Sequence, residues 1–355
     1  MRIALVIQQP QARGQELFAC TLGNFLLDQD HEVILISLFQ GDFPLSFKGK
    51  HVSLNWEVKQ KWIGISRFKS LSTELRKFNP DIVQANGGDT LKYSVLSAMI
   101  FPFSGKVIFN NGGVVSYYFR SGLQKFFYRF LLNRLQGLIS ISSYSAQDLN
   151  GLLDASIPKC QIPIGLNTNF QFALKEAAPN PVFVHIGGFT PEKNHRFLIA
   201  LWENYQSIIP ESMLVLIGGG PQKSEIEQLI DSKSLSNIHL LGSQVNPWAF
   251  VPKNAILLLP SKIEGMPSVI AESILSGIPV IAHRVGGIAE MVEALPACFL
   301  PEFENIENWS QAMNYWVSMA EEEKSNLLAS SREMVVAKFD MQVVGEQFQK
   351  FHKSL

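Results

Sequence analysis

The residues best suited to chemistry are two glutamates and one lysine in the second half of the chain. Glu264 and Glu272 stand eight positions apart, with a glycine directly after the first, and Lys193 ends the stretch Pro191-Glu192-Lys193. Carboxylates accept hydrogen bonds from hydroxyl groups, and unpaired backbone amides in the segment after Glu264 can bind a phosphate. Gly265 would let a ligand approach the backbone with no Cβ in the way. Together these groups suit a ligand that carries both sugar hydroxyls and phosphates.

A strand, a helix and a second strand are expected to position the two glutamates. The apolar run Ile256–Leu259 is too short for a core helix and predicts a buried strand. Pro267 suits the first turn of a helix, and Gly277 followed by Pro279 ends that helix before another apolar run. Such a unit forms a right-handed crossover whose ligand side is the carboxyl end of the strands.

The start of this helix also predicts an anion site. Its first amides have no partner within the helix, and the helix dipole favours negative charge there. The amides expected to point outward belong to Gly265, Met266, Ser268 and Val269.

The stretch Glu264-Gly265-Met266-Pro267, inside a strand–helix–strand unit, resembles the E-x7-E signature of glycosyltransferase family 4, retaining transferases of the GT-B fold. The resemblance implies that Glu264 contacts the hydroxyls of the donor sugar and that Glu272 holds the ribose. Phe189 to Lys193 is similar to the family's G-R-x-x-P-E-K segment, which implies that Lys193 holds the donor diphosphate. Gly188 stands where the family usually has an arginine, so Lys193 would supply most of the charge on the leaving group.

Further donor-binding positions follow from glycine-rich loops in the same half. Val182–Ile186 and Met213–Ile217 read as strands, and each runs into glycines. The loop that begins at Gly242 resembles the family segment whose backbone reads the nucleobase. The positions expected to contact the donor in these loops are Gly188, Gly219, Ser243 and Val245.

The first half opens with a strand over residues 2 to 7, a loop and a helix from Glu16 to Leu27. Gly14 and Glu16 match the family's G-G-x-E loop, with Arg13 in place of the first glycine. Asn111 follows a later strand, at a position where the family often has histidine. The resemblance places Gly14, Glu16 and Asn111 on the acceptor side of an interdomain cleft. Asn111 can hydrogen-bond a hydroxyl but cannot accept its proton.

The length of 355 residues favours two domains, each large enough for a core. We expect an α/β protein of two Rossmann-like doubly wound domains that face a cleft. Residues 1–168 would form an acceptor-binding domain and residues 180–338 a nucleotide-sugar-binding domain. The helix expected at 341–355 would pack back on the first.

Charge is divided unevenly along the chain. Residues 1 to 170 hold 17 Lys/Arg and 11 Asp/Glu, which leaves 13 and 20 of the totals of 30 and 31 for the remainder. The basic first half favours an anionic partner such as lipid headgroups, and no motif indicates nucleic acid. Tyr117–Leu135 combines an apolar stripe with four basic residues. Two interpretations stay open, a stripe that faces the core with basic side chains beside it, or a helix in a membrane interface. The basic region Lys61–Lys69 is a second candidate for membrane contact.

Neither a metal nor a disulfide framework is expected. The three cysteines are widely spaced, which indicates a reducing cytoplasm. Asp28-Gln29-Asp30 is formally D-x-D but falls in a turn away from the ligand side. No apolar run reaches the length of a membrane span. We therefore expect a cytoplasmic protein, at the inner face of the membrane if the basic segments bind there.

The resemblance implies a retaining, metal-independent transferase of hexosyl type with no cofactor, since the nucleotide diphosphate sugar is a co-substrate. The acceptor would be a glycan or a lipid-linked sugar in surface polysaccharide or glycolipid synthesis. Two alternatives stay open, a sugar-nucleotide epimerase of the same fold and a degenerate transferase that acts as a scaffold.

Overall fold

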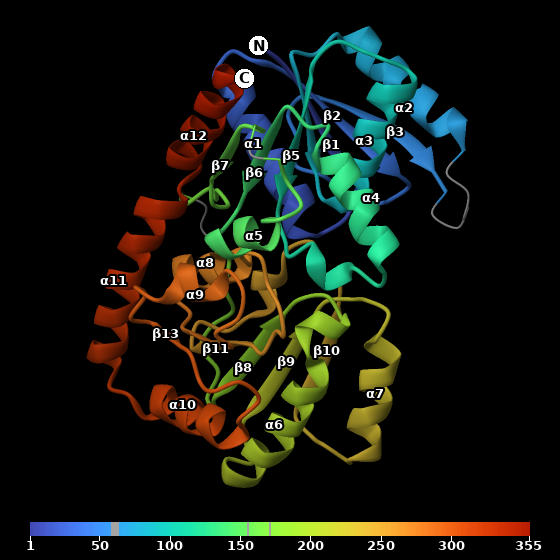
Figure 1. Ribbon diagram of the computed structural model, residues 1–355. Helices are drawn as coiled ribbons and strands as arrows, with labels where there is room; N and C mark the ends of the chain where they lie inside the picture. The colour runs from blue at the N-terminus through green and yellow to red at the C-terminus, as the bar shows by residue number, and fades with distance from the viewer. Residues whose placement is uncertain (58–63, 155, 170–171) are drawn as a thin grey trace. The chain divides into compact units, whose positions relative to one another are not determined.

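The computed structural model describes residues 1–57, 64–154, 156–169 and 172–355. The chain divides into two compact units (Figure 1). Unit 1 consists of Met1–Asn167 together with Phe339–Leu355, and unit 2 is Thr168–Lys338.

The described part of unit 1 is built on a parallel sheet of seven strands in the order β3-β2-β1-β4-β5-β6-β7. Neighbouring strands pair in parallel throughout, so their carboxyl ends lie at the same edge. The strands are β1 (Arg2–Ile7), β2 (Glu32–Phe39), β3 (Lys50–Trp56), β4 (Ile82–Asn86), β5 (Lys106–Asn111), β6 (Gly137–Ser140) and β7 (Lys159–Gln161).

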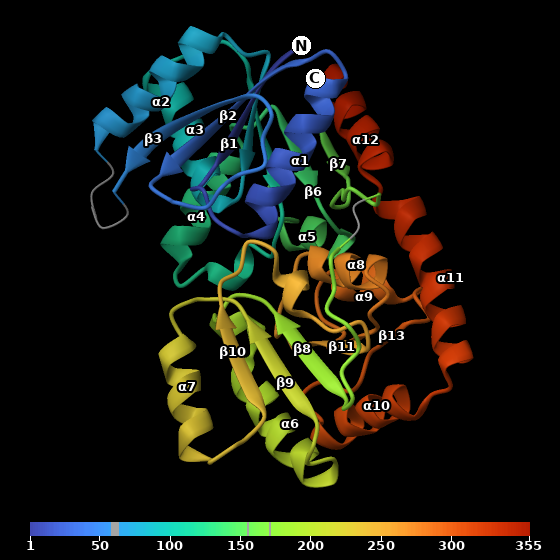
Figure 2. The same cartoon turned by 180° about the vertical axis from the view of Figure 1, so that it is seen from behind.

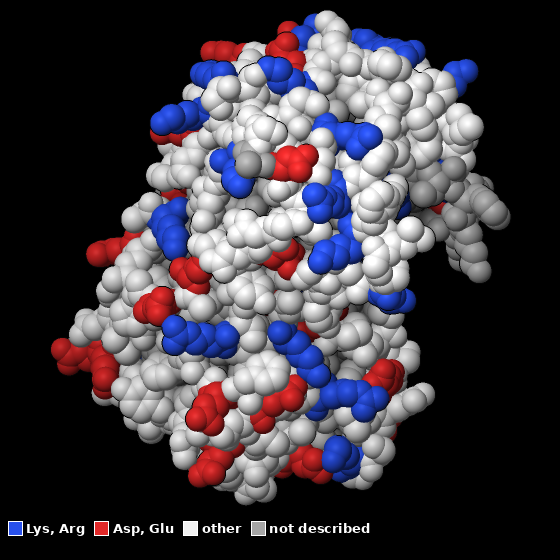
Figure 3. All heavy atoms as spheres, in the orientation of Figure 1, with Lys and Arg blue, Asp and Glu red and all other residues white. Residues whose placement is uncertain are grey.

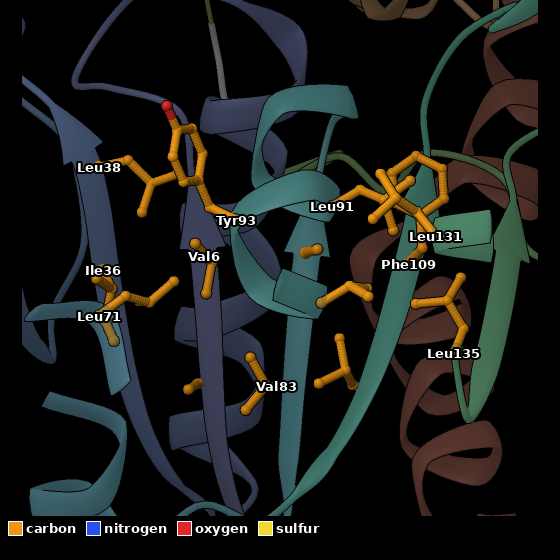
Figure 4. Packing of buried hydrophobic residues seen from close by; sticks show 14 of the residues in the cluster. Val6, Ile36, Leu38, Leu71, Val83, Leu91, Tyr93, Phe109, Leu131 and Leu135 are labelled. Atoms are coloured by element: carbon orange, nitrogen blue, oxygen red, sulfur yellow. The ribbon is translucent and has the colours of Figure 1, made fainter. Parts of the chain in front are cut away.

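Helices cover both faces of this sheet, because successive side chains of each strand point to opposite faces. In β1, Ala4 and Val6 belong to one core cluster, and Ile3, Leu5 and Ile7 belong to the other. Figure 4 shows the first cluster, which α2, α3 and α4 complete. The helical segments are α1 (Gly14–Asp28), α2 (Ile65–Phe78), α3 (Gly88–Ile100), η1 (Ser116–Tyr118), α4 (Gly122–Leu132), α5 (Ser143–Asp148) and α12 (Met341–Ser354).

The last helix, α12, packs on α1 on the second face of the sheet (Figure 1). The ring centroids of Phe18 in α1 and Phe348 in α12 are 5.4 Å apart. Asp340 caps α12, since its side chain accepts a hydrogen bond from the amide of Gln342 at 2.8 Å. The final residues of unit 1 therefore form part of its core.

The described part of unit 2 holds a second parallel sheet, of six strands in the order β10-β9-β8-β11-β12-β13. Figure 2 shows β8, β9 and β10 side by side. Its strands are β8 (Val182–Ile186), β9 (Met213–Ile217), β10 (Ile238–Gly242), β11 (Ala255–Leu259), β12 (Val280–Ala282) and β13 (Cys298–Phe299). Its helical segments are η2 (Pro191–Lys193), α6 (His195–Ile208), α7 (Lys223–Ser232), η3 (Pro247–Phe250), α8 (Ser268–Leu275), α9 (Ile288–Val292), α10 (Ile306–Ser318) and α11 (Glu321–Phe339).

Both sheets have the strand order of a Rossmann fold, so the expectation of two doubly wound α/β domains is confirmed. In unit 1 successive strands are added on one side of β1 up to β3 and on its other side from β4 onward, so the strand order reverses between β1 and β4. In unit 2 it reverses in the same way between β8 and β11. In such sheets ligands bind at the carboxyl ends of the strands next to this switch point.

Candidate functional site

Lys193 and Glu264 meet at the switch point of unit 2. Lys193 ends η2, which follows β8, and Glu264 lies in the loop after the neighbouring strand β11. Nζ of Lys193 lies 2.5 Å from Oε1 of Glu264, and the two side chains are 20% and 11% exposed. Because water reaches this ion pair poorly, it is less screened than the pairs on the surface. The structure therefore brings together the lysine and the first glutamate of the sequence motif.

Glu264 is held by two further contacts. Oγ of Ser261 donates to the same Oε1 at 2.7 Å. The backbone carbonyl of Glu264 accepts a hydrogen bond from the amide of Gly287 at 3.1 Å. A Cβ on Gly286, whose φ is +55°, would lie 1.9 Å from that carbonyl oxygen, so only glycine fits there. Sequence reasoning missed Ser261, although its position three residues before Glu264 was a usable signal.

The helix α8 begins directly after the loop that carries Glu264. It spans Ser268–Leu275, so Pro267 is the residue before the helix and not part of its first turn, which corrects the sequence expectation. Gly265, Met266 and Val269 are buried, and Ser268 is half-buried. Among the described residues, no backbone carbonyl accepts a hydrogen bond from the amides of 265, 266, 268 and 269. These four amides are available to an anion.

Glu272 lies on α8 and has a different partner. Nε1 of the buried Trp248 donates to Oε2 of Glu272 at 3.1 Å. Trp248 belongs to η3, the short segment between β10 and β11. This bond fixes one oxygen of the carboxylate and leaves the half-buried side chain a second oxygen for a ligand. The role of Trp248 was not expected from the sequence.

Three of the glycine-loop positions lie close to one another. The carbonyl of Gly219 accepts a hydrogen bond from the amide of Phe189 at 2.9 Å, and a Cβ on Gly188 would lie 3.5 Å from the same oxygen. A Cβ on Gly219 would lie 2.6 Å from Oγ of Ser243. The fourth position, Val245, is 68% exposed.

Two buried histidines lie next to Lys193. His185 and His195 have ring centroids 4.7 Å apart, and the ring of His195 stacks on Phe189. Nδ1 of His185 donates to the carbonyl of Leu258 at 2.8 Å, whereas the two nitrogens of His195 have no partner in the described structure. Burial, above all, lowers the pKa of His185 to about 4 and that of His195 to about 2, with a contribution from the Lys193 charge. Both rings are therefore neutral at physiological pH.

In unit 1, Glu16 lies inside the protein near the start of α1, whereas Gly14, the first residue of that helix, is exposed. Nε2 of Gln11 donates to Oε1 of Glu16 at 2.8 Å, and Oε2 has no partner among the described residues. Burial raises the pKa of Glu16 to about 7, against opposing contributions from Gln11 and Arg13. Glu16 is thus a carboxyl group that exchanges its proton near neutral pH.

Asn111 ends β5 and is buried, with its amide already engaged. Nδ2 donates to the carbonyl of Ser145 at 3.4 Å, and Oδ1 accepts from the amide of Gly113 at 3.4 Å. The next loop residue, Gly112, meets α1, because a Cβ there would coincide with the amide of Gln15. The start of α1 and the loop after β5 are therefore in contact within unit 1, close to the carboxyl ends of β1 and β5.

In the amphipathic segment Tyr117–Leu135 the core interpretation holds for most of the apolar stripe, since Phe119, Phe127 and Phe130 pack against the core cluster, but it is wrong for Leu123 and Phe126. Leu131 and Leu135 are buried beside Phe109 (Figure 4). Leu123 is 78% exposed and Phe126 69% exposed, because they lie on the outward face of α4. We call the surface formed by these two side chains with Tyr117, Tyr118, Arg120, Lys125 and Arg129 the α4 patch.

The remaining sequence expectations concern membranes and metals. In the region Lys61–Lys69, residues 61–63 lie outside the described residues and 65–69 belong to α2. Throughout the described parts of the chain, no helix has the length and apolar character needed to span a bilayer. Within the same residues, no group of His, Cys, Asp and Glu side chains is arranged to hold a metal ion.

Comparison with known proteins gives matches for both units. Residues 12–170 match the Glycosyltransferase Family 4 model, and residues 167–333 match the Glycosyl transferases group 1 model. An uncharacterized glycosyltransferase of Methanocaldococcus jannaschii is 32% identical over 102 residues, which are 28% of this chain and 25% of that protein. The sulfoquinovosyl transferase of Arabidopsis thaliana is 23% identical over 297 residues, which are 76% of this chain and 56% of that protein. The chain thus spans about a quarter to a half of the length of these relatives.

Solved structures share the whole fold at low sequence identity. HepE of Anabaena, in complex with UDP and glucose, has a TM-score of 0.81 at 18% identity and covers 100% of both chains. The sucrose-phosphate synthase of Thermosynechococcus elongatus has a TM-score of 0.83 at 18% identity and covers 99% of this chain and 98% of that one. The strand order of both sheets and the two family models indicate the same family. The chain therefore belongs to the GT-B glycosyltransferases, with a family 4 first unit and a group 1 second unit.

Proposed function

We propose that the protein transfers a hexosyl group from a nucleoside diphosphate sugar to an acceptor hydroxyl, with retention of configuration at the anomeric carbon. The observation that carries this proposal is the meeting of Lys193 and Glu264 at the carboxyl ends of β8 and β11, with the available amides of residues 265, 266, 268 and 269 directly after Glu264. A cation and oriented amides suit a diphosphate, and a carboxylate suits sugar hydroxyls.

Each group has a role in this reaction. Lys193 and the amides from Gly265 to Val269 stabilise the negative charge that develops on the diphosphate as it departs. Glu264 accepts hydrogen bonds from the hydroxyls of the transferred sugar. Glu272, oriented by Trp248, accepts hydrogen bonds from the ribose. Because these groups already supply the charge that the leaving group needs, we expect no metal requirement.

The relatives support the donor class and suggest the pathway. HepE of Anabaena was solved with UDP and glucose. A relative in Campylobacter jejuni, 29% identical over 175 residues, transfers N-acetylgalactosamine to a diphospho-undecaprenol-linked sugar. We therefore propose a nucleotide sugar as donor and a glycan or lipid-linked sugar as acceptor, in surface polysaccharide or glycolipid synthesis. On the acceptor side we place Gly14, Glu16 and Asn111 in unit 1.

The α4 patch supports contact with the membrane that would carry such an acceptor. Leu123 and Phe126 are exposed apolar side chains on a helix whose other exposed positions include Lys125 and Arg129. Figure 3 shows basic side chains separated by uncharged surface on the face where α4 lies. An apolar helix face flanked by basic residues fits the interface of an anionic bilayer. We propose that the protein works at the cytoplasmic face of the membrane.

The transfer proposal is tested in two steps. Thermal shift assays with UDP, GDP and ADP and their hexose conjugates identify the donor, since a bound ligand raises the melting temperature. Product analysis with and without an acceptor then separates transfer from epimerisation, because an epimerase would convert the donor alone. Lys193→Ala and Glu264→Ala should each lower kcat/KM by roughly 100- to 1000-fold while the protein stays folded. Near-normal turnover in either variant would overturn the assigned roles.

A further inference from the structure

The two groups assigned to different parts of the donor are bound to each other in the structure. Nζ of Lys193 and Oε1 of Glu264 are 2.5 Å apart, yet Lys193 is assigned to the diphosphate and Glu264 to the sugar. Donor binding therefore has to exchange this ion pair for two new sets of contacts. The consequence depends on whether both new partners arrive together.

An intact nucleotide sugar supplies both partners. Its diphosphate replaces the carboxylate at Lys193, and its sugar hydroxyls replace the ammonium at Glu264 as hydrogen-bond donors. A nucleoside diphosphate without sugar supplies only the first. Glu264, whose side chain is only 11% exposed, would then lose its counter-charge. Its carboxylate would also lie close to the negative charge of the diphosphate. Among the side chains that the structure describes, Ser261 would then be its one remaining partner, with one hydrogen bond.

We propose that the Lys193–Glu264 ion pair is a selectivity device, which makes the site bind the intact donor in preference to the nucleoside diphosphate that the reaction releases. The inference rests on the proposed function, and it adds that Glu264 weakens the binding of the spent nucleotide. The pair thereby favours product release. Once the sugar has left, Glu264 has lost its hydrogen-bond donors and competes with the diphosphate for Lys193.

The exchange needs only side-chain movement, because the backbone on the lysine side is held in place. The amide of Lys193 donates to the carbonyl of Thr190 at 3.1 Å. Asn194, the next residue, has a φ of +58°, and its Nδ2 donates to Oε1 of Glu304 at 2.9 Å. The flexible lysine side chain can turn from Glu264 to a phosphate while its Cα stays fixed.

The test compares two affinities in one near-isosteric variant. Glu264→Gln keeps the oxygen that accepts from Ser261 but removes the negative charge. Calorimetric titration of the wild type and the variant uses the nucleoside diphosphate and the matching hexose conjugate from the UDP, GDP or ADP series that stabilises the wild type. We expect the variant to bind the diphosphate at least about tenfold more tightly, since a like charge beside it has been removed. The conjugate should bind more weakly, because its sugar hydroxyls lose a charged acceptor whose hydrogen bonds contribute more than that repulsion costs.

Glu203→Gln is the matched control, because Glu203 pairs with Lys233 at 2.6 Å on the surface of unit 2. This variant should bind both ligands as the wild type does. A Glu264→Gln variant that keeps the wild-type melting temperature and binds the diphosphate no more tightly would overturn the selectivity device. Should Glu264→Gln unfold, Glu264→Ser provides the same comparison with the charge removed. A wild type that binds none of the six ligands would instead contradict the proposed function.

Discussion

Oγ of Ser261 lies 2.7 Å from Oε1 of Glu264, the same oxygen that binds Lys193. Ser261 is fully buried, and its carbonyl accepts a hydrogen bond from Nδ1 of the buried His283 at 3.1 Å. The serine hydroxyl is thus a donor in a fixed position. It keeps the Glu264 carboxylate oriented when Lys193 turns to the diphosphate.

Ser261→Ala should lower kcat by roughly tenfold or more, because a hydrogen bond to a charged group contributes about 1.5–3 kcal/mol. Affinity for the nucleoside diphosphate should change little, since the hydroxyl does not contact it. Ser261→Thr retains the hydroxyl and should recover most of the loss. Ser232→Ala, which removes a hydroxyl bonded to a backbone carbonyl on α7, is the control. Equal activity of the Ala and Thr variants would contradict this role.

Trp248→Phe should raise KM for the donor by about tenfold with a smaller effect on kcat, because Glu272 loses the donor that orients it toward the ribose. Trp309→Phe is a closely matched control. Trp309 is equally buried in unit 2, and its Nε1 has no partner among the described residues, so that substitution removes no hydrogen bond. Steady-state kinetics on both variants decides the point, and equal KM values in the two would argue against a role for Trp248.

Glu16→Gln should make the protein more stable at neutral and alkaline pH. The pKa of Glu16 is raised from 4.5 to about 7, so between these values the unfolded chain loses its proton before the folded one. Stability therefore falls as pH rises through this window, by about 3 kcal/mol in total. The glutamine variant has no such loss, and its advantage should grow from pH 4.5 to pH 7. Urea unfolding followed by circular dichroism measures it, with the exposed Glu32→Gln as control.

His195→Phe should make unit 2 more resistant to acid. The pKa of His195 is lowered from 6.5 to about 2, so below pH 6.5 the unfolded chain takes up a proton that the folded one excludes. Stability thus falls with falling pH by about 1.4 kcal/mol per pH unit. Phenylalanine keeps the stacking on Phe189 and loses no hydrogen bond. Unfolding at pH 7 and pH 5, followed by tryptophan fluorescence, should show the difference, which His239→Phe on the surface of β10 should lack.

Leu123→Ser combined with Phe126→Ser should abolish binding to anionic vesicles and leave turnover of a water-soluble acceptor unchanged. Vesicle flotation with phosphatidylglycerol measures the first effect, and binding by the wild type should weaken as salt is raised. Tyr315→Ser, which removes an exposed aromatic ring from unit 2, is the control. The membrane proposal fails if the wild type does not float with these vesicles.

The sequence was most informative where one local signal decides the structure. The short apolar runs that became β8 and β9 end in glycines, and the run that became β11 ends at Pro260. Short apolar runs that end in turn residues are typical of buried parallel strands. The cap of α12 is another local signal, because Asp340 directly precedes the helix and aspartate accepts hydrogen bonds from the first amides of a helix. The family resemblance assigned Lys193 and Glu264 to different parts of one donor but did not predict their ion pair, which forms because both residues come after strands that are neighbours in the sheet.

Long-range packing decided what the sequence left open. The periodicity of α4 was correct, but no pattern could tell that Leu131 is buried in the cluster with Phe109 while Phe126 is 69% exposed. The sequence placed Trp248 in a short connection between two strands and gave no sign of a partner for its indole. The hydrogen bond to Glu272 depends on where η3 lies relative to α8, which only the folded structure determines. His185 and His195 are neutral because both rings are buried. The residue type and its neighbours in the sequence do not predict that burial.

The position of α12 has a consequence for how the chain acquires its structure during synthesis. Met341, Val344, Phe348 and Phe351 complete a cluster whose other buried members come from the first 162 residues. The earlier segments of unit 1 therefore leave the ribosome with one face of their sheet covered only in part, by α1, and all of unit 2 is made before α12 completes the cover. Unit 2 can finish folding first, although it comes second in the gene.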